Sequence, residues 1–179
     1  MDENEFKKLI KKDKYQVFLF SCPANIPFNF ARHHWFVVNS KGKINRWDVL
    51  RTYNLLRTDE GTDTKESFGG KKFKIISKKV GYVYKNILPF TSGVSKYRWK
   101  LKPFSKGELV SSIEGNSNSI AHKMIAFIEH NSFKYKHRNK YYVLGPNSNT
   151  FIQWIIDKFP GCGFKLSWRA VGKNYKVKD

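Results

Sequence analysis

Two adjacent histidines, one aspartate and one serine have side chains that could carry out nucleophilic chemistry together. His33 and His34 begin one apolar segment, Asp48 lies in the next, and Ser148 opens a helical pattern. A histidine held by a carboxylate is the base-and-orienter half of a nucleophilic triad, because the acid fixes the tautomer and stabilises the imidazolium. We therefore treat these four residues as candidate catalytic groups.

Ser148 lies in the segment Gly145-Pro-Asn-Ser-Asn-Thr-Phe151, where a tight turn runs into a helix. A helix N-terminus presents unpaired N–H groups and a partial positive charge, which stabilise a nucleophile or an oxyanion. Asn147, Asn149 and Thr150 are candidate binding residues there. The alternative is plain helix capping, since these residue types contribute about 1 kcal/mol as caps.

A β-hairpin is expected to bring a histidine to Asp48. A turn centred on Lys41-Gly42 would pair position 33 with 50 and 35 with 48, which makes His33 and Asp48 diagonal neighbours on one face. A slip of one residue would substitute His34 for His33. The alternative is that one histidine points to water and the other makes an ordinary hydrogen bond.

Four motifs occur in the order seen in an uncharacterised bacterial family, a catalogued domain of unknown function. They are His33-His-Trp35, Arg46-Trp-Asp-Val49, Gly145-Pro-Asn-Ser-Asn-Thr-Phe151 and Ala170-Val-Gly-Lys-Asn-Tyr175. The seven-residue turn is the specific motif, and the others gain weight from their order. The chain resembles that family over most of its length, which supplies a relationship without a reaction.

The chain is also distantly similar to circularly permuted papain-like enzymes of the NlpC and lecithin retinol acyltransferase type. That resemblance implies a permuted papain-like fold, with His33 or His34 as base, Asp48 as orienting acid and Ser148 as nucleophile. It implies a hydrolase or acyltransferase acting on an acyl or amide group. This sequence has serine where those enzymes have cysteine, and a serine, with its far higher pKa, needs a well-placed base. A non-hydrolytic site is the alternative.

Apolar patterns and turn residues predict a single α+β domain over residues 1–179, with an antiparallel sheet packed against helices. Residues 51–70 are polar and are expected to form a mobile loop, and 173–179 a loose basic tail. The predicted strands are 15–21, 33–39, 44–50, 72–77, 80–84, 97–101, 141–144 and 164–170, and the predicted helices are 2–12, 119–131 and 151–159.

The chain is strongly basic, with 34 Lys and Arg against 14 Asp and Glu and a formal net charge of +20. Such a charge attracts polyanions such as nucleic acid or anionic lipid. Lysines alternate with aromatic residues over 133–141, so Lys134, Lys136 and Arg138 are candidate contacts in a non-catalytic binding module. The alternative is that an A+T-rich genome, which enriches lysine everywhere, explains the charge.

No pattern in the sequence predicts a metal or another cofactor. Cys22 and Cys162 lack metal-ligand spacing and a disulfide framework, and His122 and His130 are two helical turns apart, so packing or surface roles are expected for all four. The sequence shows no signal peptide and no apolar run of membrane-spanning length, which predicts a cytoplasmic protein.

Overall fold

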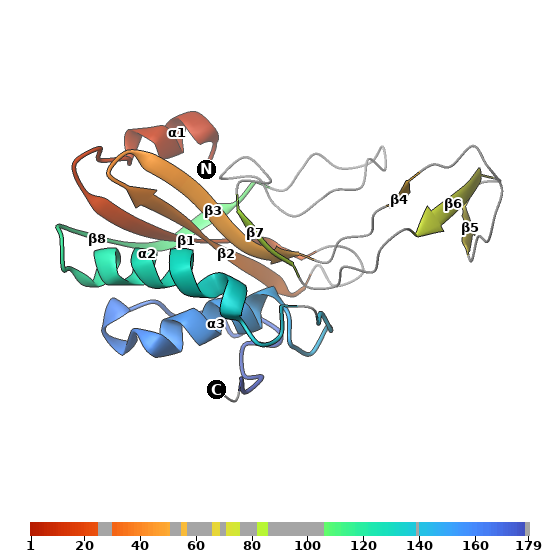
Figure 1. Cartoon of the computed structure of the whole chain (residues 1–179). Coiled ribbons are helices and arrows are strands. Elements are labelled where there is room, and N and C mark those ends of the chain that lie inside the picture. The colour runs from red at the N-terminus through yellow and green to blue at the C-terminus, as the bar shows by residue number, and fades with distance from the viewer. Residues whose placement is uncertain are drawn as a thin grey trace.

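A five-stranded antiparallel sheet forms the centre of the protein, with helices on both faces (Figure 1). The computed structural model describes residues 1–24, 30–50, 55–56, 66–68, 71–75, 82–85, 106–138 and 140–177. The sheet has the order β7-β3-β2-β1-β8, formed by β7 (Tyr82–Lys85), β3 (Lys43–Leu50), β2 (Arg32–Ser40), β1 (Tyr15–Pro23) and β8 (Glu108–Gly115). The predicted α+β class, with an antiparallel sheet packed against helices, is confirmed.

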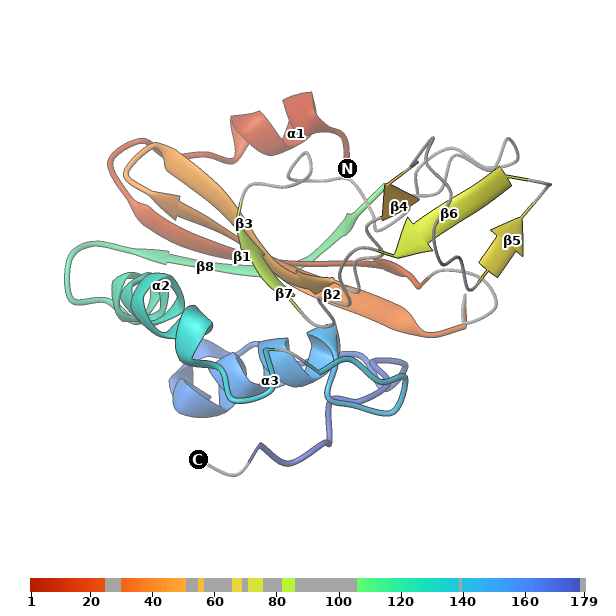
Figure 2. The ribbon, with the colours of Figure 1, turned by 45° about the vertical axis from the view of Figure 1, so that its right-hand side comes forward.

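Both faces of the sheet are covered, so β1 and β2 are buried at every position except their ends. Two helices, α2 (Ile120–Asn131) and α3 (Ser148–Lys158), lie against one face (Figure 2). Alternate strand residues such as Leu19, Phe36 and Val49 join the core on this side. Their neighbours Phe20 and Trp35 join a smaller core on the side of α1 (Glu3–Lys8). This period of two decides which side chains of β2 and β3 share a face.

Side chains at the N-caps stabilise the starts of the helices. Ser119 accepts a hydrogen bond from the N–H of His122 at the start of α2, and Asn147 caps α3. Asp2 and Glu5 form a reciprocal capping box on α1. Such bonds satisfy N–H groups that have no partner within the helix.

Short elements complete the described structure. A second small sheet has the order β4-β6-β5, and two 3₁₀ helices follow α2 and α3; these elements are β4 (Leu55–Leu56), β6 (Lys71–Ile75), β5 (Glu66–Phe68), η1 (Ser132–Lys134) and η2 (Pro160–Cys162). The helix expected over 2–12 is shorter, because it ends after Lys8. In the part of the chain described, no helix has the length and apolar character needed to cross a membrane.

Two predicted strands are wrong. Residues 141–144 form a turn, because the N–H of Tyr142 donates to the carbonyl of Pro146 and that of Gly145 donates to the carbonyl of Tyr142. Residues 164–170 are irregular; Phe164 and Leu166 are buried, but this segment joins neither sheet. The apolar alternation of 164–170 predicted the burial of Phe164 and Leu166 correctly. It did not predict that the segment has no neighbouring strand to pair with.

Several expectations concern residues that the structure describes only in part. The strand expected over 97–101 lies outside the described residues, and of 51–70 only β4 and β5 are described. In the C-terminal segment, Lys173 donates to the carbonyl of Leu166 and Val177 packs against the larger core, while 178–179 lie outside the described residues. Strand β8 was not predicted, because its alternating exposed and half-buried residues include few apolar ones.

Candidate functional site

The hairpin of β2 and β3 sets the position of His33 relative to Asp48. Lys41 and Gly42 form the turn with positive φ angles of 49° and 91°, and the N–H of Gly42 donates to Oδ1 of Asn39. Phe36 pairs with Trp47, which is the register predicted from the sequence. In this register, His33 and Asp48 point to the same face of the sheet.

A continuous chain of hydrogen bonds joins Ser148, His33 and Asp48. The Oγ atom of Ser148 lies 2.7 Å from Nδ1 of His33. Both carboxylate oxygens of Asp48 lie 3.0 Å from Nε2 of the same ring, and the angular geometry of a hydrogen bond is satisfied by Oδ2. Because a carboxylate only accepts, Nε2 carries the proton, and Nδ1 of the neutral ring is then free to accept from the serine hydroxyl.

Arg46 completes the group by compensating the charge of Asp48. Its guanidinium donates to Oδ2 of Asp48 over 2.7 Å and stacks over the ring of Trp35, with 4.2 Å to the centroid. Burial alone would raise the pKa of Asp48, but the interactions with His33 and Arg46 outweigh burial and hold that pKa below its ordinary value. Asp48 is therefore an anion at neutral pH.

The two histidines both contact the start of α3, in different ways. Oδ1 of Asn149 accepts from the backbone N–H of His34 over 3.1 Å and from its Nδ1 over 2.9 Å. Burial lowers the pKa of His34 to about 4, so this ring is neutral at pH 7. Its Nε2 atom is buried and has no hydrogen-bond partner among the residues that the structure describes. Of the two alternatives that the sequence left open, the ring beside Ser148 is that of His33.

Capping of α3 is performed by Asn147 and Thr150. The N–H groups of Asn149 and Thr150 donate to Oδ1 of Asn147, and the N–H of Asn147 donates to Oγ1 of Thr150. Neither the Oγ nor the N–H of Ser148 takes part in these bonds. Helix capping therefore accounts for Asn147 and Thr150. It does not account for the hydroxyl of Ser148, which is hydrogen-bonded to His33.

The C-terminal motif holds this helix start against the hairpin. Thr150 donates to the carbonyl of Gly172 over 2.7 Å, and the side-chain amide of Asn149 donates to the carbonyls of Arg32 and Val171. Gly172 has a φ of 87°, and a Cβ there would lie 2.3 Å from Nδ2 of Asn147. Only glycine fits this contact, which explains the glycine in the motif from Ala170 to Tyr175.

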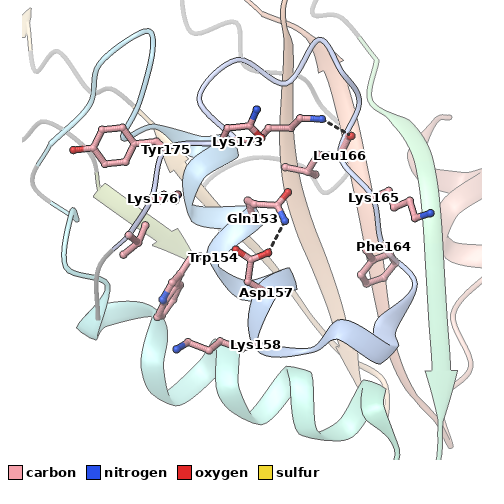
Figure 3. A pocket seen from close by; sticks show the side chains of 12 residues that line it. Gln153, Trp154, Asp157, Lys158, Phe164, Lys165, Leu166, Lys173, Tyr175 and Lys176 are labelled. Carbon is pink, nitrogen blue, oxygen red and sulfur yellow. Dashed lines mark hydrogen bonds between the residues drawn. The ribbon is translucent and has the colours of Figure 1, made fainter.

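The three hydrogen-bonded side chains are closed off from solvent. The exposed fraction is 4% for His33, 1% for Asp48 and 2% for Ser148. A cavity of about 1010 Å³ lies elsewhere, between the later turns of α3 and the C-terminal segment, and Trp154, Asp157, Leu166 and Tyr175 are among its lining residues (Figure 3). Because Ser148 is not one of them, this cavity provides no access to its hydroxyl.

The remaining candidate residues take no part in this chain of hydrogen bonds, although Cys22 is the cross-strand partner of His33. Lys134, Lys136 and Arg138 are exposed on η1 and the turn that follows it, and Arg138 donates to the carbonyl of Phe133. Both cysteines are buried. His122 packs against Tyr15 and accepts from a backbone N–H, and His130 is exposed. Among the described residues, no three His, Cys, Asp or Glu side chains gather as a metal site would require.

Sequence reasoning gave no role to Arg46 or Trp35. A signal for Arg46 was present, because it lies two residues before Asp48 on one strand and therefore on the same face. The register that brought His33 to Asp48 also places Trp35 directly opposite that aspartate. A buried carboxylate requires a compensating cation, and Arg46 was the basic residue on that face.

Comparison with protein-family models identifies the chain as a member of a known family. Residues 14–175 match the model of DUF3750, a family of proteins of unknown function, and the chain belongs to that family. Searches of the curated proteins and of the solved structures gave no significant match. The family supplies no reaction.

Proposed function

We propose that the chain is a hydrolase or acyltransferase that uses Ser148 as a nucleophile on an acyl or amide carbonyl. The observation that carries this proposal is the continuous hydrogen-bonded chain from Ser148 through His33 to Asp48. Helix capping does not require it, because Asn147 and Thr150 cap α3. The distant similarity to permuted papain-like enzymes favours the same assignment.

The chemistry follows from the direction of the two hydrogen bonds. As Oγ of Ser148 attacks the carbonyl carbon, its proton passes to Nδ1 of His33. Asp48 stabilises the resulting imidazolium through Nε2–H, and Arg46 keeps Asp48 ionised. The imidazolium then gives its proton to the leaving group, and water or an acceptor alcohol or amine releases the acyl group from Ser148.

The start of α3 offers a donor for the oxyanion that forms on the substrate. The N–H of Ser148 is outside the capping bonds of Asn147, and it lies where the partial positive charge of the helix is greatest. A hydrogen bond to the tetrahedral intermediate at this point is typically worth about 3 kcal/mol of barrier. We assign this role to the N–H of Ser148.

Substrate access requires a local opening, because Ser148 is almost fully buried. The turn before α3 and the segment after Ala170 are the adjacent elements, and both are joined to the helix start through Asn147. We expect the site to react slowly in the closed state and faster once these segments separate.

A fluorophosphonate probe tests the proposal without knowledge of the substrate. Attack by Oγ of Ser148 on phosphorus forms an O–P bond, expels fluoride and transfers the serine proton to His33. We expect a covalent adduct by intact-mass measurement, mapped to the peptide that contains Ser148. The adduct should be absent in Ser148→Ala and at least about a hundredfold slower to form in His33→Gln.

Ser132→Ala is the matched control, because Ser132 is also buried but its hydroxyl has no imidazole partner in the described part of the chain. It should be labelled at the rate of the wild-type protein. The proposal is refuted if the wild-type protein forms no adduct, or if Ser148→Ala, shown to be folded by circular dichroism, is labelled equally fast.

A further inference from the structure

The turn that precedes α3 presents three consecutive apolar side chains to solvent. Tyr142, Val143 and Leu144 are all exposed, and the exposed fraction of Leu144 is 79%. Apolar side chains scattered singly over a surface need no explanation, whereas contiguous ones mark sites of interaction. This turn is therefore a candidate contact surface.

The turn is held in this shape by its backbone. The turn has two internal backbone hydrogen bonds. In addition, the carbonyls of Tyr142 and Val143 accept from Nδ2 of Asn147, within 3.3 Å. The same amide is 3.1 Å from the carbonyl of Val171. Because the backbone is fixed at several points, Leu144 cannot fold back onto the core without breaking these bonds.

Two other exposed aromatic residues belong to segments tied to the same end of the domain. Trp168, which is 86% exposed, lies three residues before Val171. Its neighbour Arg169 donates from Nε to the carbonyl of Phe30, which is 57% exposed, and accepts from the N–H of Arg32. We call these exposed side chains the apolar rim: Phe30, Tyr142, Val143, Leu144 and Trp168.

The sequence around the rim is basic throughout. Residues 130–156 contain no Asp or Glu, and neither do residues 162–177. Each of these segments carries four Lys or Arg residues, namely Lys134, Lys136, Arg138 and Lys140 in the first and Lys165, Arg169, Lys173 and Lys176 in the second. The partner that such charge selects is anionic.

We propose that the apolar rim docks the protein on an anionic lipid bilayer. Tyr142, Leu144 and Trp168 enter the interface between headgroups and acyl chains, and the surrounding lysines contact the lipid phosphates. Nucleic acid would use the same lysines and stack bases on the aromatic rings. It would gain nothing from Val143 and Leu144, which are the aliphatic part of the turn, so lipid is the better fit.

This inference does not depend on the nucleophilic role of Ser148. Docking would bring the bilayer to the end of the domain where α3 starts, four residues beyond Leu144. The turn on which the rim is built is one of the two segments that border the buried hydroxyl. Ser148→Ala should nevertheless bind vesicles as the wild-type protein does, which separates the two proposals.

Vesicle co-sedimentation tests the proposal. The full chain is mixed with vesicles of phosphatidylcholine alone, or of phosphatidylcholine and phosphatidylglycerol at a ratio of about 7:3, at near-physiological salt. We expect binding to the anionic vesicles and roughly tenfold weaker binding by Leu144→Glu. The emission of Trp168 should shift to the blue on binding, and this shift should be missing in Trp168→Phe.

Ile120→Glu is the control, because Ile120 is also an exposed apolar residue. It is the first residue of α2 and follows the end of β8 that pairs with the start of β1. This variant should bind as the wild-type protein does. The proposal is overturned if the wild-type protein does not bind the anionic vesicles, or if Leu144→Glu binds them as tightly as the wild type. It is also overturned if a single-stranded oligonucleotide is bound equally well by the wild type and Leu144→Glu and displaces both from the vesicles.

Discussion

Burial of His34 in its neutral form makes the stability of the protein depend on pH. Its pKa is about 4 in the folded protein against an ordinary value of 6.5, and desolvation by burial is the main cause. Between these two values the unfolded chain binds a proton that the folded protein does not. Stability is therefore fully present above pH 6.5 and falls as the pH falls toward 4.

The size of the effect follows from those two pKa values. At pH 7.5 the imidazole is neutral in both states, so its titration hardly changes the free energy of unfolding. At pH 5 it is largely protonated in the unfolded chain and largely neutral in the fold, which lowers the free energy of unfolding by about 2 kcal/mol. The pKa of Asp48 is held below 3.8, so this carboxylate loses its partners' stabilisation only at lower pH.

Urea unfolding at pH 7.5 and pH 5, followed by tryptophan fluorescence, measures this difference. His34→Gln removes the titrating ring, and we expect the pH-dependent loss to shrink by most of the 2 kcal/mol, whatever the variant's stability at pH 7.5. His130→Gln, which removes an exposed imidazole near the end of α2, is the control and should keep the wild-type dependence. An unchanged loss in His34→Gln would show that another group is responsible and would refute the reasoning.

Three further predictions concern the contacts around the same helix start. Gly172→Ala should lower the free energy of unfolding by roughly 2 kcal/mol or more, because the new Cβ meets Asn147; Gly163→Ala, with positive φ but no atom within 4 Å, should cost about 1 kcal/mol in the same urea titration. Asp48→Asn should cost roughly 3 kcal/mol, because it removes the buried carboxylate that accepts from both His33 and Arg46; a loss below 1 kcal/mol would contradict that role. Ser148→Cys should gain a thiol that reacts with iodoacetamide at neutral pH, as found by peptide mapping, because the adjacent imidazole promotes thiolate formation; reaction at Cys22 alone would contradict it.

Local sequence fixed the hairpin and the helix start. Gly42 supplies the positive φ that its turn requires, and the alternation of side chains then determines the register that sets His33 diagonal to Asp48. Asn147, followed by an apolar helical period, determines where α3 begins. Each of these features depends on residues within a few positions of one another, so the sequence contains all the information.

Only the tertiary structure decided what these elements contact. The hydrogen bond between Ser148 and His33 joins residues 115 positions apart, and no local pattern states that distance. The pairing of His34 with Asn149 and the fit of Gly172 against Asn147 depend in the same way on how α3 and the C-terminal segment pack. The strands predicted for the apolar segments 141–144 and 164–170 are wrong for the same reason. A strand needs a neighbouring strand to pair with, and the position of that neighbour is set by the whole fold.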